Sequence, residues 1–91
     1  MSEDKLKRKC VSWLKKEHPD VWFYCPTDHF YSGIPDFIIC NKGKFIAVEL
    51  KTPTGKTTKI QDWTHERIKK SGGIVYVFRS FDVFKIFISS L

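Results

Sequence analysis

The sequence has no long apolar run and no low-complexity segment. Its purely apolar stretches, such as residues 37–40, are only a few residues long, whereas a helix that crosses a bilayer needs ~20. The N-terminal residues are polar and lack the apolar region of a secretory signal. These absences predict a cytoplasmic protein with no membrane span.

Cysteine is scarce, with three residues at wide spacing, Cys10, Cys25 and Cys40. An odd and widely spaced set suits reduced thiols in a reducing compartment better than a disulfide framework. We therefore expect all three side chains to fill the core.

A chain of 91 residues is too short to support two hydrophobic cores, so we expect one domain over residues 1–91. With 42% hydrophobic and 15% aromatic residues it can bury a core, which excludes a disordered chain. Acidic residues are in the minority, because 16 Lys and Arg face 10 Asp and Glu and give a formal net charge of +6. This balance favours a polyanionic partner such as nucleic acid.

Hydrophobic spacing and turn residues divide the chain into helices and strands. Helices are predicted from residue 3 to just before Pro19, after the capping Ser2, and from about residue 60 to Gly72. Strands are predicted at residues 21–25, 37–40, 45–48 and 74–78, and residues 81–91 fit a helix better than a strand. The order α-β-β-β-α-β-α predicts an α/β fold in which helices flank a mixed four-stranded sheet.

The residues around the expected hairpin bring three charges together. If Lys42 and Gly43 form a two-residue turn, counting outward places Asp36 opposite Glu49 on the neighbouring strand. Alternation along the strand puts Lys51 on the same face as Glu49. A different turn length would shift this pairing by one residue.

Two carboxylates that face each other on a sheet destabilise it unless something positive lies between them. Their oxygens would form part of a Mg²⁺ shell that water and a substrate phosphate complete, an arrangement used in phosphodiester hydrolysis. The alternative is an ordinary surface cluster of ion pairs. The apolar neighbours of both acids favour the metal site, since an unpaired carboxylate is costly there.

The same residues resemble a known signature. Ile34-Pro35-Asp36, twelve further residues and then Glu49-Leu50-Lys51 resemble the PD-(D/E)XK nuclease motif. The surroundings are more similar to the virus-type replication-repair nuclease (VRR-NUC) domain, through residues 33–36, 43–45, 47–51, 53–56, Gln61 and the Gly72-Gly73 pair. The resemblance covers almost the whole chain and implies a restriction-endonuclease-like core.

The resemblance also implies roles for individual residues. Asp36 and Glu49 would be ligands of Mg²⁺ or Mn²⁺, assisted by the Leu50 carbonyl, and Lys51 would orient or activate the attacking water. Together they imply a metal-dependent deoxyribonuclease.

Glu3 and Gln61 are further candidate catalytic residues by the same resemblance. Glu3 shares a helix face with Leu6 and could reach the site, but an acid in a first helical turn is also favoured by the helix dipole. Gln61 has a second interpretation too, because residues 58–61 read as a capping box.

Basic and aromatic residues around the motif suggest contacts with nucleic acid. The candidates for phosphate contacts are Lys42, Lys44, Lys56 and Lys59, each of which is otherwise a solvated lysine. Tyr24, Phe30 and Tyr31 could stack on bases or ribose, although aromatic residues more often belong to the core. The histidines, His18, His29 and His65, show no ligand pattern, and the sequence assigns them no role.

The leading hypothesis is a metal-dependent DNA endonuclease selective for branched, junction or nicked DNA in replication, recombination or repair. The alternative is a non-catalytic nucleic-acid-binding module on the same fold. We expect no small-molecule substrate and no membrane contact. A homodimer that buries part of the apolar residues 81–91 is predicted as well.

Overall fold

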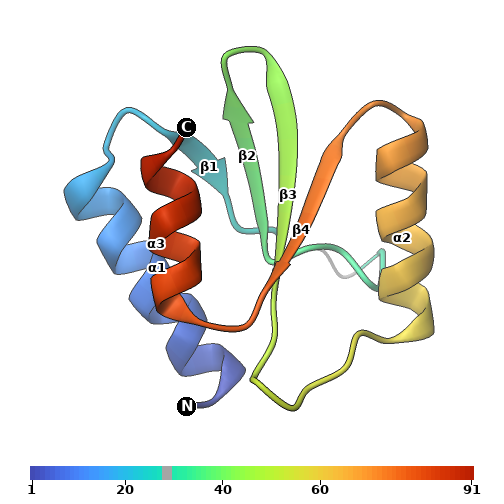
Figure 1. The fold of residues 1–91 in the computed structure, drawn as a ribbon. Helices are drawn as coiled ribbons and strands as arrows, with labels where there is room; N and C mark the ends of the chain where they lie inside the picture. Colours follow the sequence, from blue (N-terminus) through green and yellow to red (C-terminus); the bar gives the residue numbers. More distant parts are fainter. Residues whose placement is uncertain (28–29) are drawn as a thin grey trace.

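The computed structural model describes residues 1–27 and 30–91, and its elements follow the predicted order. They are α1 (Glu3–Glu17), β1 (Trp22–Tyr24), β2 (Phe37–Asn41), β3 (Lys44–Leu50), α2 (Lys59–Lys70), β4 (Ile74–Phe78) and α3 (Phe81–Ser89). The last element confirms a helix after residue 80. Helices α1 and α3 lie together on one side of the sheet and α2 stands on the other (Figure 1).

The sheet has the order β1-β2-β3-β4, with antiparallel pairing among the first three strands and β4 parallel to β3. The predicted hairpin register is confirmed, because Asn41 pairs with Lys44 and Ile38 pairs with Ala47. Lys42 and Gly43 have φ values of 52° and 78°, as a two-residue turn with the twist of the flanking strands requires. The mixed four-stranded sheet is therefore the one expected.

The hydrophobic core lies between the sheet and the pair α1 and α3. Its members from β2 and β3 are Phe37, Ile39, Ile46, Val48 and Leu50, and those from the helices are Leu6, Cys10, Leu14, Phe84 and Ile88. The expectation that every cysteine fills the core is wrong, because Cys40 is exposed and Cys25 is only partly buried. Cys40 lies on the face of β2 opposite to Ile39, and α2 packs against β4 rather than β2.

The C-terminal helix α3 packs into the core of its own chain. Phe84 and Ile88 are fully buried, and Phe81, Phe87 and Leu91 pack against the core. The expectation that residues 81–91 leave a large apolar surface is therefore wrong, since α3 exposes mainly Val83 and Ile86. Across the described part of the chain, every helix is too short or too polar to cross a membrane.

Candidate active site

The candidate site lies at the end of the sheet where β2 begins and β3 ends. Asp36 precedes the first residue of β2, and Glu49 is the next-to-last residue of β3. The loop before Asp36 is set by Gly33, which has φ 74° and packs against the start of α2. A Cβ at Gly33 would lie 2.8 Å from the carbonyl carbon and oxygen of Ile60, so only glycine allows this approach.

The Asp36 carboxylate has a partner on each oxygen. Its Oδ2 accepts a hydrogen bond of 2.8 Å from the Leu50 N–H, and its Oδ1 lies 3.6 Å from Lys7 Nζ. These contacts hold the carboxylate between α1 and the end of β3. Sequence reasoning missed Lys7, although it lies four residues after Glu3 and so shares its helix face.

Glu49 is the exceptional residue of the site, because its side chain is buried and only 2% of the residue is exposed. Burial, together with hydrogen bonding to Asp36 and repulsion by the Asp36 charge, raises the pKa of Glu49 from its usual 4.5 to about 9. Its Oε1 is buried without a hydrogen-bond partner in the described structure. A carboxyl group held in this way has an unpaired oxygen and a high cost of ionisation.

His65 of α2 faces that unpartnered oxygen. Its Nε2 lies 3.7 Å from Glu49 Oε1, is itself buried and has no hydrogen-bond partner among the described residues. Burial lowers the pKa of His65, which favours a neutral imidazole at pH 7. Sequence reasoning assigned His65 no role, but its position four residues after Gln61 and three before Ile68 places it on an inward helix face.

His18 is not part of this arrangement. The His18 ring packs 4.7 Å from the ring of Trp13, measured between centroids. His29 lies outside the described residues.

Lys51 and Glu3 complete the group. Lys51 is only 6% exposed, and its Nζ lies 3.8 Å from Glu3 Oε1. The Lys51 N–H donates to the Phe78 carbonyl at 3.0 Å, so pairing with β4 continues past the end of β3 and positions the lysine. Glu3 therefore reaches the site through Lys51.

Gln61 lies in the capping box of α2. Its Oε1 accepts from the Thr58 N–H at 2.9 Å, and Thr58 Oγ1 accepts from the Gln61 N–H at 3.2 Å. This is the capping interpretation of the sequence. The side chain is used to begin the helix, and its catalytic role stays a prediction.

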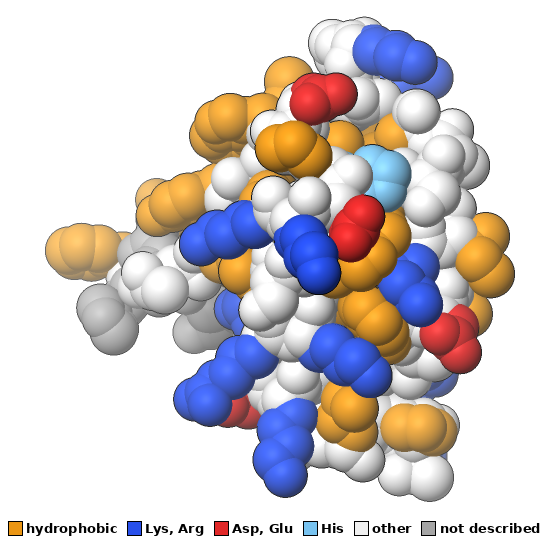
Figure 2. All heavy atoms as spheres, turned by 90° about the vertical axis from the view of Figure 1, so that its left-hand side faces the viewer, with side chains coloured by type: hydrophobic (Ala, Val, Ile, Leu, Met, Phe, Trp, Pro, Cys, Tyr) orange, Lys and Arg blue, Asp and Glu red, His pale blue; other side chains and the backbone are white. Residues whose placement is uncertain are grey.

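The predicted phosphate-binding lysines form two separate pairs. Lys42 and Lys44 lie at the hairpin turn, and Lys44 precedes Glu49 by five residues of β3, roughly 17 Å at ~3.3 Å per residue. Lys56 and Lys59 lie in the loop after β3 and at the start of α2. Further basic side chains spread over the face that carries α1 and α3 (Figure 2).

The loop between β3 and α2 is held by Arg79, a residue that sequence reasoning did not select. Its Nη1 donates to the Thr52 carbonyl at 2.9 Å and also to the Gly55 carbonyl. Arg79 follows β4 directly, so the end of this strand fixes the loop that follows Lys51. The loop is therefore anchored beside the candidate site.

The chain belongs to the VRR-NUC family, because the sequence model of the VRR-NUC domain matches residues 1–82. Two similar solved structures support the fold. One, described as a VRR-NUC domain, is 24% identical with a TM-score of 0.76 and covers 96% of this chain and 94% of its own. The other, a VRR-NUC domain protein, is 19% identical with a TM-score of 0.81 and covers 98% and 87%. No curated protein matches the chain.

The family is nuclease-related. Among residues 1–27 and 30–91, no group of three or more His, Cys, Asp and Glu side chains is placed to hold a metal. A partly hydrated Mg²⁺ needs only one or two carboxylates, however, because it keeps several water ligands. The unpartnered Oε1 of Glu49 beside Asp36 meets that requirement.

The raised pKa of Glu49 predicts how stability changes with pH in EDTA. Since the folded pKa of about 9 exceeds the usual value of 4.5, Glu49 contributes stability below pH 4.5 that is lost as the pH rises toward 9. Glu49→Gln should remove this loss, because an amide does not gain a charge when the chain unfolds, and at pH 8 its free energy of unfolding should exceed that of the wild type by roughly 1–3 kcal/mol or more.

Urea denaturation from pH 5 to pH 9 measures the free energy of unfolding of the wild type and of Glu49→Gln. The difference between the two free energies should grow as the pH rises. Glu66→Gln is the matched control, since Glu66 is an exposed glutamate on α2. A difference between wild type and Glu49→Gln that stays constant across this range would contradict the raised pKa.

Proposed function

We propose that this protein is a metal-dependent DNA endonuclease that acts on branched, junction or nicked DNA in replication, recombination or repair. The observation that carries the proposal is the burial of Glu49 beside Asp36 with one oxygen unpartnered. A buried carboxyl oxygen without a partner destabilises the folded chain, whereas a bound metal ion would take that oxygen as a ligand. Membership of the VRR-NUC family supports the same reaction class.

In this proposal, Asp36 and Glu49 bind the metal ion and Lys51 acts on the attacking water. Asp36 and Glu49, with the Leu50 carbonyl, would hold Mg²⁺ or Mn²⁺, which lowers the pKa of bound water and neutralises charge on the phosphate. Lys51, fixed by its Glu3 contact and by the Phe78 carbonyl, orients the attacking water and offsets the developing negative charge.

The alternative is a non-catalytic module that holds DNA with the same lysines. It would leave the convergence of Asp36, Glu49 and Lys51 without a purpose. The homodimer expected from the sequence stays a prediction, and the surface that α3 offers to it is reduced to Val83 and Ile86.

We expect the purified protein to nick or cut DNA with Mg²⁺ or Mn²⁺ and not with EDTA, as measured on supercoiled plasmid and on branched and linear oligonucleotides. Asp36→Asn, Glu49→Gln and Lys51→Ala should each lower the rate by roughly 100-fold or more, because each removes a charge from the reacting centre. Lys70→Ala, an exposed lysine at the end of α2, is the control.

Two results would refute the nuclease proposal. Cutting that persists in EDTA would exclude the metal mechanism, and normal cutting by all three variants would exclude the site. Metal-independent binding of DNA without any cleavage would establish the alternative function.

His65 is proposed as a positioning residue for Glu49. With the proton on Nε2, the neutral imidazole, now 3.7 Å from Glu49 Oε1, would donate to the Glu49 carboxylate when a bound metal ion keeps it ionised. His65→Leu should raise the Mn²⁺ concentration for half-maximal stabilisation in thermal melts by about 10-fold or more. His65→Gln, which keeps a donor, should restore part of this affinity, and equal affinity in all three proteins would contradict the role.

DNA binding should be sensitive to salt if Lys56 and Lys59 contact phosphates. The slope of log affinity against log salt should become shallower by about 2 in the Lys56→Ala, Lys59→Ala double variant, since each phosphate contact contributes about 0.9. Titrations in EDTA over a range of salt concentrations measure this slope without cleavage. A slope equal to that of the wild type would place the DNA path elsewhere.

A further inference from the structure

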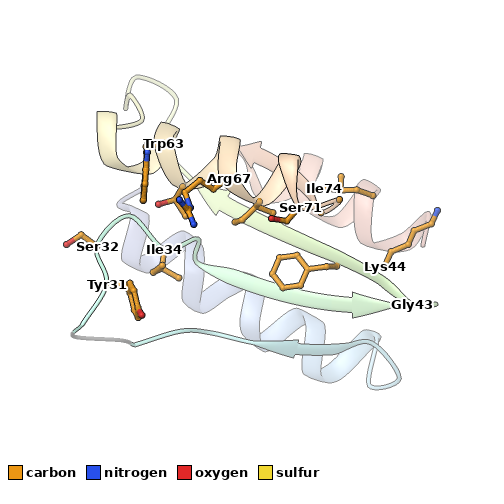
Figure 3. Close-up of a pocket in the computed structure, with 14 residues that line it drawn as sticks. Tyr31, Ser32, Ile34, Gly43, Lys44, Trp63, Arg67, Ser71 and Ile74 are labelled. Atoms are coloured by element: carbon orange, nitrogen blue, oxygen red, sulfur yellow. The ribbon is translucent and has the colours of Figure 1, made fainter.

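A groove of about 930 Å³ runs along α2 between that helix and the β2–β3 hairpin. Figure 3 shows Tyr31, Ile34 and Trp63 toward one end and Gly43 and Lys44 at the other, with Arg67 beside Trp63. Nothing in the metal mechanism uses this groove. It is therefore a surface whose chemistry needs its own explanation.

Aromatic rings stand open to solvent in the groove. Trp63 is 57% exposed, Tyr31 is 69% exposed and Phe45 is 45% exposed. Water-exposed rings of this size, gathered in one concave surface, are typical of sites that bind a flat or apolar group. Because these rings are exposed to solvent, they contribute little to the stability of the fold.

The charge of the groove has one sign. Lys44 and Arg67 line it, and no acidic side chain does so among the described residues. The Arg67 guanidinium lies 4.8 Å from the centroid of the Trp63 ring, which pairs a cation with an aromatic face. The ligand that fits such a surface has flat rings and negative charges.

Residues that line the groove are close in sequence to the candidate active site, although Asp36, Glu49 and Lys51 are not part of its described lining. Ile34 precedes Asp36 by two residues, and Thr64, another lining residue, is adjacent to the His65 that faces Glu49. The other end of the groove is at Lys44, which precedes Glu49 along β3 by roughly 17 Å at ~3.3 Å per residue. The separation between Lys44 and Glu49 is about five times the 3.4 Å rise of one nucleotide in duplex DNA.

We propose that this groove binds unpaired nucleotides of the DNA substrate, with Trp63 and Tyr31 stacking on bases and Arg67 and Lys44 contacting phosphates. The inference rests on the proposed nuclease function and names its substrate class as DNA in which a duplex passes into a single strand. Stacking on aromatic rings within a basic groove is the usual mode of single-strand binding without sequence preference. Intact duplex cannot use the groove in this way, because its bases are already stacked and paired.

A second copy of the chain fits the groove less well. Its own matching surface would bring Lys44 and Arg67 of both copies together, with no acidic lining residue to compensate them in the described structure. Charge complementarity thus favours a polyanion.

The test measures binding of a fluorescent oligo(dT) by anisotropy in EDTA, where cleavage cannot interfere. Trp63→Ala should weaken binding by about 10-fold, since stacking of one base contributes ~1–3 kcal/mol. Binding of a blunt duplex should stay unchanged, and Trp63→Phe should keep most of the single-strand affinity. Trp22→Ala is the matched control, because Trp22 is 59% exposed on β1 and lies outside the groove.

Thermal melts establish that each variant is folded, and light scattering follows its mass. The proposal is overturned if the wild type does not bind oligo(dT), if Trp63→Ala binds it normally, or if this variant loses single-strand and duplex binding equally. A fall in mass of Trp63→Ala would assign the groove to contacts between copies and would also overturn it. Metal-dependent cutting of plasmid by the wild type is scored separately, so the groove can fail while the nuclease function stands.

Discussion

The pairing of β2 with β3 through a two-residue turn is the constraint on which the rest of the molecule depends. Because side chains alternate along both strands, this register sends Phe37, Ile39 and Val48 into the core and brings Asp36 beside Glu49. A shift of one residue would exchange the buried and exposed faces and separate the two carboxylates. The same hydrogen bonds therefore specify both the fold and the site.

The candidate active site lowers the stability of the folded protein. Glu49 is buried beside another carboxylate, and neither its Oε1 nor the facing His65 Nε2 has a hydrogen-bond partner in the described structure. The core on the opposite face of the sheet, together with the hydrogen bond from Leu50 to Asp36, holds this arrangement in place. Functional sites commonly keep such unfavourable local contacts, and the surrounding structure must offset them.

Local patterns were enough to predict the elements and the hairpin register, since the Lys42-Gly43 turn and strand alternation act over a few residues. The sequence patterns gave wrong predictions of burial where it depends on contacts between elements that are far apart in the chain. Cys40 is exposed because α2 packs against β4, and residues 81–91 are covered because α3 lies beside α1. His65, Lys7 and Arg79 were missed because their partners lie far away in sequence, at Glu49, Asp36 and Thr52.

The sequence by itself determined the order of helices and strands, the excess of positive charge and the motif that joins Asp36, Glu49 and Lys51. Those properties follow from residue type and short spacing. Only the tertiary structure decided that Glu49 is buried against His65 and that Trp63 and Tyr31 line one groove. Burial and proximity depend on how helices dock on the sheet, and that packing sums contacts between residues that no local pattern connects.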